Sequence, residues 1–179
     1  MDLLSLLTAA FDVHRTQIME LENKLRTHSF AVTAEVSLEI ERDWRHSRLY
    51  TADFLVVDEE GSAPRLVELS PVEFVDHPPI QVVDRGVELE IRELVWDRVR
   101  FVIGGRRLDA SDFDDVLSKW HWSWEEDDLP LANGNIHSVT MTGAGIGVDF
   151  GSASPEAFLD VLETLANVGI SRAVVVRDK

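Results

Sequence analysis

The feature that most constrains the fold is a change of hydrophobic period near residue 28. Between Asp2 and Thr27 apolar residues recur every three or four positions, which is typical of an amphipathic helix. From Phe30 to Glu41 the even positions are apolar and the odd positions are mostly polar, which predicts a strand with one buried face. A helix followed directly by such a strand predicts mixed helix and sheet.

Later segments repeat the strand pattern between short polar turns, which favours antiparallel pairing. We expect strands over residues 49–57, 65–69, 87–103 (interrupted where the alternation changes phase), 136–142, 146–150 and, as an interior strand, 173–176. Two later helices are expected, one near Asp112 and one at Ser154, where Pro155 suits the first turn. The prediction is a single acidic α+β domain over residues 1–179, with an antiparallel sheet of about six to eight strands and the helices packed against it.

The charge balance restricts the partners of the chain. With 33 Asp and Glu against 17 Lys and Arg, the formal charge is −16, which disfavours direct binding to nucleic acid or to anionic membranes. The chain has no cysteine, which excludes disulfides, thiolate zinc sites and cysteine nucleophiles. No apolar run approaches the roughly 18 residues of a membrane span, and no signal peptide is evident. We expect a cytoplasmic protein.

The most distinctive segment is residues 109–128, which holds eight carboxylates, one lysine and three of the five tryptophans. Indoles supply contact area at protein interfaces, and flanking anions steer a basic partner toward them. The alternative is that the indoles cover the edge of the sheet and the acids only keep the surface charged. The predicted partner-binding residues are Asp112, Asp114, Asp115, Trp120, His121, Trp122, Trp124, Glu125, Glu126, Asp127 and Asp128.

Motifs for catalysis are weak. The glycine run 142–147 precedes an expected strand, so it predicts a hairpin turn rather than a dinucleotide loop. Glu68, Glu73 and Asp76 offer carboxylates for general acid and base roles beside an expected loop, although carboxylates abound in this chain. The histidines show no ligand spacing. We therefore assign no catalytic, cofactor-binding or metal-binding residue and expect no cofactor.

Three functions remain open. The first is a binding protein that neutralises a basic protein partner, such as a toxin or nuclease, in the manner of an immunity protein or inhibitor. The second is an enzyme that uses carboxylates with His121 or His137, with or without a divalent metal. The third is a small-ligand or sugar-binding module in which the tryptophans form a stacking platform.

Overall fold

The computed structural model describes residues 2–39, 49–70, 75–105, 108–120, 134–142 and 145–178, and the described residues form an α+β fold. The helices are α1 (Leu3–His28), α2 (Asp114–Trp120) and α3 (Pro155–Asn167), with a 3₁₀ turn at Ala110–Phe113. The strands are β1 (Ala31–Glu39), β2 (Leu49–Val57), β3 (Arg65–Val67), β4 (Ile80–Asp84), β5 (Val87–Ile91), β6 (Val99–Ile103), β7 (Ser138–Thr142), β8 (Gly145–Asp149) and β9 (Arg172–Arg177). The predicted fold class is confirmed.

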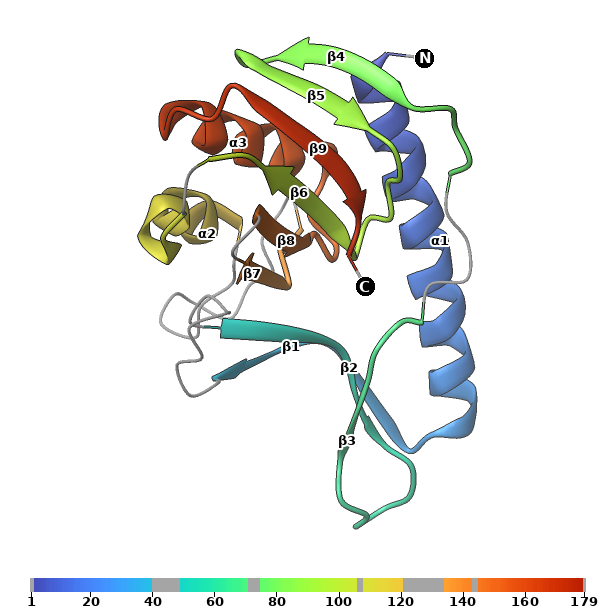
Figure 1. The fold of residues 1–179 in the computed structure, drawn as a ribbon. Coiled ribbons are helices and arrows are strands. Elements are labelled where there is room, and N and C mark those ends of the chain that lie inside the picture. The colour runs from blue at the N-terminus through green and yellow to red at the C-terminus, as the bar shows by residue number, and fades with distance from the viewer. Residues whose placement is uncertain are drawn as a thin grey trace.

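The strands divide into two sheets rather than the one that the sequence suggested (Figure 1). β1, β2 and β3 form an antiparallel sheet, and the second sheet has the order β4-β5-β9-β6-β8-β7. Within the second sheet only β5 and β9 pair in parallel. As predicted, β9 is an interior strand, and the glycine run joins the antiparallel strands β7 and β8.

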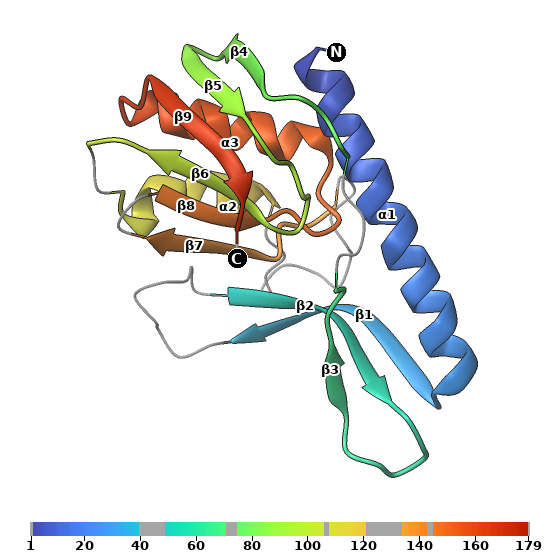
Figure 2. The same cartoon turned by 45° about the vertical axis from the view of Figure 1, so that its right-hand side comes forward.

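Helix α1 connects the two sheets. Asp2 caps its start by accepting a hydrogen bond from the Ser5 amide at 2.9 Å. Its first turns bury Leu3, Leu6 and Leu7 in the large core, and Leu25 near its end packs with residues of the three-stranded sheet. Figure 2 shows α1 running past both sheets. One helix therefore fixes the position of the small sheet relative to the large one.

Helix α3 covers one face of the six-stranded sheet. It begins after Ser154, with Pro155 in its first turn, and buries an apolar stripe that includes Phe158, Val161 and Leu162. Phe158 contacts Phe101 of β6, with 5.1 Å between the ring centroids. No helix in the described part of the chain is both long and apolar enough to cross a membrane.

Burial along β1 does not follow the simple alternation expected from the sequence. Val32, at an even position, packs toward α1, whereas Ser37, at an odd position, is 2% exposed. Both faces of β1 are covered here. Ser37 hydrogen-bonds Thr51 of β2 at 3.2 Å, and the Thr51 amide donates to the carbonyl of His137 in the loop before β7. The expectation of one solvated face was therefore wrong for this part of β1.

Candidate functional site

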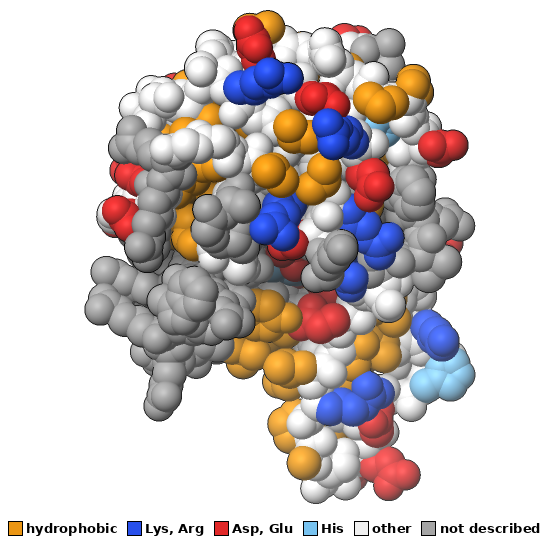
Figure 3. All heavy atoms as spheres, in the orientation of Figure 1, with side chains coloured by type: hydrophobic (Ala, Val, Ile, Leu, Met, Phe, Trp, Pro, Cys, Tyr) orange, Lys and Arg blue, Asp and Glu red, His pale blue; other side chains and the backbone are white. Residues whose placement is uncertain are grey.

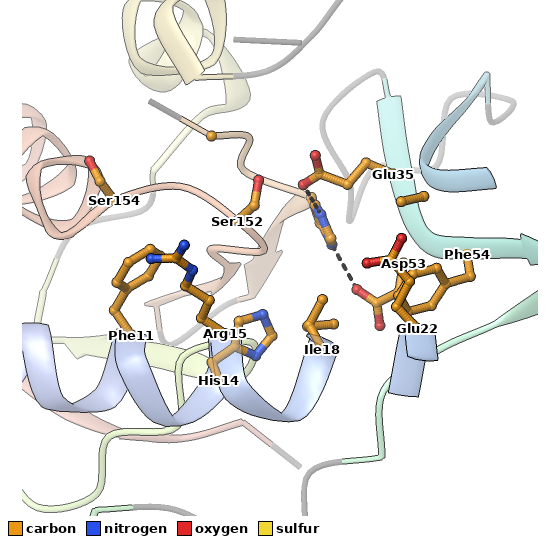
Figure 4. A pocket seen from close by; sticks show the side chains of 13 residues that line it. Phe11, His14, Arg15, Ile18, Glu22, Glu35, Asp53, Phe54, Ser152 and Ser154 are labelled. Atoms are coloured by element: carbon orange, nitrogen blue, oxygen red, sulfur yellow. Dashed lines mark hydrogen bonds and ion pairs between the residues drawn. The ribbon is translucent and has the colours of Figure 1, made fainter. Parts of the chain in front are cut away.

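A buried group of charged side chains lies where the two sheets meet. His137, in the loop before β7, has its Nε2 atom 3.1 Å from Glu35 Oε1 of β1 and its Nδ1 atom 3.3 Å from Asp53 Oδ1 of β2. The dashed lines in Figure 4 mark these contacts. His137 is 2% exposed and Asp53 is 6% exposed. We call these three residues the carboxylate–histidine cluster.

The backbone around His137 fixes the orientation of its ring. The Thr51 amide donates to the His137 carbonyl, and the His137 amide donates to the Asp149 carbonyl, both at 2.9 Å. Gly151 approaches the ring so closely that a Cβ atom there would lie 2.2 Å from His137 Cδ2. The φ angle of Gly151 is +47°, which also favours glycine. The turn after β8 therefore leaves His137 little freedom to rotate.

Glu35 adopts a backbone conformation that is rare within a strand. Its φ angle is +49°, in the left-handed region. The neighbouring pairs Ala34–Phe54 and Val36–Ala52 place Glu35 opposite Asp53. A left-handed non-glycine residue costs about 1 to 3 kcal/mol and persists only when its surroundings hold it there. Such residues gather at functional sites, which draws attention to Glu35.

Burial and pairing both act on the protonation of the cluster. Burial opposes a charged His137, but Asp53 and Glu35 outweigh it and raise the pKa of His137 well above its ordinary value. Burial also opposes charged carboxylates, yet His137 holds the pKa of Asp53 and of Glu35 below the ordinary value. At neutral pH the cluster is therefore an imidazolium between two carboxylates.

A cavity of about 450 Å³ adjoins the cluster, between α1 and the three-stranded sheet (Figure 4). Glu35, Asp53 and His137 form part of its wall. The α1 side is contributed by residues three or four positions apart, which share one helix face. These are Phe11, His14, Arg15, Ile18 and Glu22.

His14 is an unusual member of this wall. It is 5% exposed, and its Nε2 atom has no hydrogen-bond partner in the described structure. Burial lowers the pKa of His14 to about 4, and the charge of His137 acts in the same direction. His14 is therefore a neutral imidazole with one unsatisfied nitrogen at the cavity.

The groups that line the cavity suit recognition better than proton transfer. A general acid or base works best with a pKa near the operating pH. Each titratable group of the cluster, and His14 beside it, has its pKa moved away from neutrality. Asp149, which lies 3.9 Å from His137 Nδ1 but does not line the cavity, differs from them because burial raises its pKa to about 7. In the described residues there is no group of three or more His, Asp or Glu side chains arranged to hold a metal ion. Both ring nitrogens of His137 face carboxylates instead.

The predicted partner-binding segment lies elsewhere and is described only in part. Asp114 and Asp115 are exposed in the first turn of α2, and Asp112 accepts a hydrogen bond from the Asp109 amide. Trp120 is 2% exposed in the large core, and its Nε1 donates to Asp160 at 2.7 Å. Outside the described residues lie His121, Trp122, Trp124, Glu125, Glu126, Asp127 and Asp128.

The carboxylates proposed for acid and base roles do not line the cavity. Glu68 accepts a hydrogen bond from the Tyr50 hydroxyl at 2.5 Å, and Asp76 is exposed. Glu73 lies outside the described residues. Of the two histidines considered for an enzyme, His137 belongs to the site.

Sequence reasoning missed Glu35, Asp53 and His14, although two of them left a signal. His14 lies on the apolar stripe of the first helix, and Asp53 is the one charged residue in the strand Leu49–Val57. Glu35 occupies an ordinary polar position of an alternating strand, so its sequence context gives no warning. None of the protein-family models, curated proteins or solved structures compared with this chain matches it.

Proposed function

We propose that this protein binds a small organic molecule in the cavity beside the carboxylate–histidine cluster. The observation that carries the proposal is Glu35, a charged residue held in a left-handed conformation at the cavity wall. The cavity volume of about 450 Å³ falls within the range of small-molecule sites. Apolar walls with a few fixed polar groups are typical of such sites.

The site favours the ligand-binding alternative over the enzyme alternative. The charged groups of the carboxylate–histidine cluster are paired and at least half-buried, which orients a ligand, and their pKa values suit constant charge near neutral pH. The polar contacts would come from β1, β2 and the loop before β7. Of the tryptophans considered from the sequence, Trp120 does not line this wall, and Trp122 and Trp124 lie outside the described residues.

A cavity-filling variant tests the proposal. Ala34 lines the cavity and is exposed, so Ala34→Trp should fill the space without disturbing the core. The control is Thr33→Trp, because Thr33 is an exposed neighbour in β1 that does not line the cavity. Ligand-observed NMR with a library of small water-soluble fragments should detect binders to the wild type and to Thr33→Trp that are lost in Ala34→Trp.

Two results would contradict the proposal. One is that no fragment of the library binds the wild type and loses binding in Ala34→Trp. The other is a set of binders that bind Ala34→Trp as well as they bind the wild type. Circular dichroism and the melting temperature of each variant establish that the fold is retained.

A second candidate function is the binding of a basic protein partner. It is favoured by Asp114 and Asp115, which are exposed and have no ion-pair partner in the described part of the chain. Figure 3 shows acidic and basic side chains intermingled on the face in view, so a surface of one sign does not cover that face. An acidic docking surface would instead be centred on α2.

The test of this second candidate is salt-dependent capture. In affinity capture from the source cell at low ionic strength, the wild-type protein should retain a basic protein. Added salt should release that protein because it screens the charges. The double variant Asp114→Asn with Asp115→Asn should retain less of it. Equal retention by the variant, or retention that does not respond to salt, would argue against this function.

A further inference from the structure

The charges on the cavity wall are separated in space. In the view of Figure 4, Arg15 lies beside Phe11 on one side of the cavity, whereas Glu35, Asp53 and Glu22 lie on the other. Along α1, Arg15 and Glu22 are two turns apart, which corresponds to about 10 Å of helix rise. The cavity therefore has a basic side and an acidic side.

The basic side has an unpaired charge. Six arginines of the described structure, from Arg26 to Arg100, lie within 4.0 Å of a carboxylate, whereas Arg15 has no such partner there. A guanidinium is well shaped to bind a carboxylate through two hydrogen bonds. Arg15 thus offers an anion-binding group at the cavity.

The acidic side offers acceptors. Glu35 and Asp53 are ionised, and His14 adds an acceptor between them and Arg15. The neutral His14 ring has one N–H donor and one acceptor nitrogen, and its Nε2 atom has no partner in the described structure, so the tautomer protonated at Nδ1 presents Nε2 as an acceptor. A buried polar atom without a partner costs about 1 to 3 kcal/mol. An N–H donor from a ligand would remove that cost.

Between the two sides the wall is apolar. Phe11, Ile18 and Phe54 line the cavity, and Phe11 is held by an edge contact with Trp96 at 5.8 Å between ring centroids. Apolar side chains favour an apolar ligand body, and the aromatic faces of Phe11 and Phe54 also tolerate a nearby cation.

We propose that the cavity takes a small zwitterion whose ammonium and carboxylate groups stand at opposite ends of an apolar chain. The carboxylate pairs with Arg15, and the ammonium donates to Glu35 and to His14 Nε2. This assignment rests on the proposed ligand-binding function and adds the chemical class of the ligand.

The test uses four probes that differ in their charged groups. The zwitterion is 6-aminohexanoate, hexylamine lacks the carboxylate, and hexanoate lacks the ammonium. Norleucine is an isomer of 6-aminohexanoate with both charges on one carbon. We expect 6-aminohexanoate to bind at least about tenfold more tightly than each of the others, which corresponds to about 1.4 kcal/mol. Chemical-shift titration gives the four dissociation constants.

Variants assign the two ends of the probe. Arg15 is exposed, so Arg15→Gln should keep the fold and reduce the preference for 6-aminohexanoate over hexylamine to below about threefold. Arg15→Lys should retain part of that preference. The control is Arg26→Gln on the same helix, which should leave all four constants unchanged because Arg26 does not line the cavity.

The outcomes separate this inference from the proposed function. If hexylamine or norleucine binds as tightly as 6-aminohexanoate, or if none of the four probes binds, the zwitterion assignment is overturned. In that case, fragments whose binding is lost in Ala34→Trp would still support a ligand site. If no such fragments are found either, both the zwitterion assignment and the proposed ligand-binding function are overturned.

Discussion

At the scale of single residues, His14 links stability to pH. Burial, supported by the charge of His137, lowers its pKa to about 4, although Asp53 and Glu35 act in the opposite direction. In the unfolded chain the pKa returns to about 6.5. The unfolded state therefore takes up this proton first as the pH falls, and stability is lost between about pH 6.5 and pH 4.

We predict that His14→Gln weakens this acid sensitivity. Between pH 7 and pH 4.5 the wild type should lose about 2 to 3 kcal/mol more than the variant, because glutamine has no proton to gain. Urea unfolding at several pH values measures the difference. The control is His28→Gln at the exposed end of α1, which should retain the wild-type slope, and an unchanged slope in His14→Gln would contradict the prediction.

His137 gives a second prediction at this scale. In His137→Gln the carboxylates of Glu35 and Asp53 lose the cation between them, so unfolding at pH 7 should become easier by about 3 to 5 kcal/mol. Adding Glu35→Gln removes one of the two charges and should restore about 1 to 3 kcal/mol. Chemical denaturation of His137→Gln, Glu35→Gln and the double variant completes the double-mutant cycle. Additive losses of unfolding free energy would show that His137 and Glu35 do not interact.

The pH dependence of the carboxylate–histidine cluster follows from the way folding shifts the pKa values of its three residues. The pKa of His137 is raised on folding, so its contribution is present below about pH 6.5 and is lost as the pH rises through the folded pKa. The pKa values of Glu35 and Asp53 are lowered, so their contribution is lost as the pH falls. The cluster is therefore most stabilising in a window around weakly acidic to neutral pH.

At the scale of elements, the turn after β8 sets the position of the His137 ring. Gly151 and Gly86 both have positive φ angles, +47° and +81°, but only Gly151 would bring a Cβ atom against other atoms. Gly86, in the turn between β4 and β5, has open space around that position. The two glycines form a matched pair that separates backbone conformation from close packing.

We predict that Gly86→Ala costs about 1 kcal/mol, from backbone conformation alone. Gly151→Ala should cost about 1 to 3 kcal/mol more because its methyl group collides with His137. Thermal unfolding compares the two variants, and the NMR signals of the His137 ring should shift in Gly151→Ala alone. Equal losses of stability in Gly86→Ala and Gly151→Ala would contradict the prediction, because they would mean that the His137 ring moves aside without an energetic penalty.

At the scale of the whole molecule, the two sheets have cores of very different size. The small core contains Leu25, Phe54 and Val56 as its buried residues, whereas the large core includes residues of all three helices and of the six-stranded sheet. Regions with few buried apolar contacts open at lower free energy than the rest of a protein. The three-stranded sheet should therefore open first, and the cavity between it and α1 should open with it.

Hydrogen exchange tests this difference. Amides of β1 and β2 should exchange before those of β6 and β9 in the wild type. Leu25→Ala should accelerate exchange of β1 and β2 selectively. Leu7→Ala, in the large core, should lower the protection of β6 and β9 by about 2 to 5 kcal/mol and change that of β1 and β2 less, because their opening leaves the large core intact. Uniform protection across the two sheets, or equal effects of the two variants, would contradict the prediction.

Local patterns predicted most of the fold. The first helix, the meander of β1 to β3, the hairpin of β7 and β8, and the interior strand β9 all follow from periodicity and turn residues close together in the chain. The division into two sheets did not follow, because periodicity identifies strands but does not identify their partners. Burial of the second face of β1 depended on the distant loop before β7 and was therefore also missed.

The change of period near residue 28 determined by itself that a long amphipathic helix leads into an antiparallel sheet, because the helical and strand repeats are local properties of the chain. Tertiary structure alone decided which charged residues meet. Glu35, Asp53 and His137 come from three segments, and although Asp53 is the one charged residue of its strand, nothing in the sequence shows that it meets the other two. Their juxtaposition depends on the register of β1 with β2 and on the packing of the two sheets against α1, which act between residues far apart in the sequence.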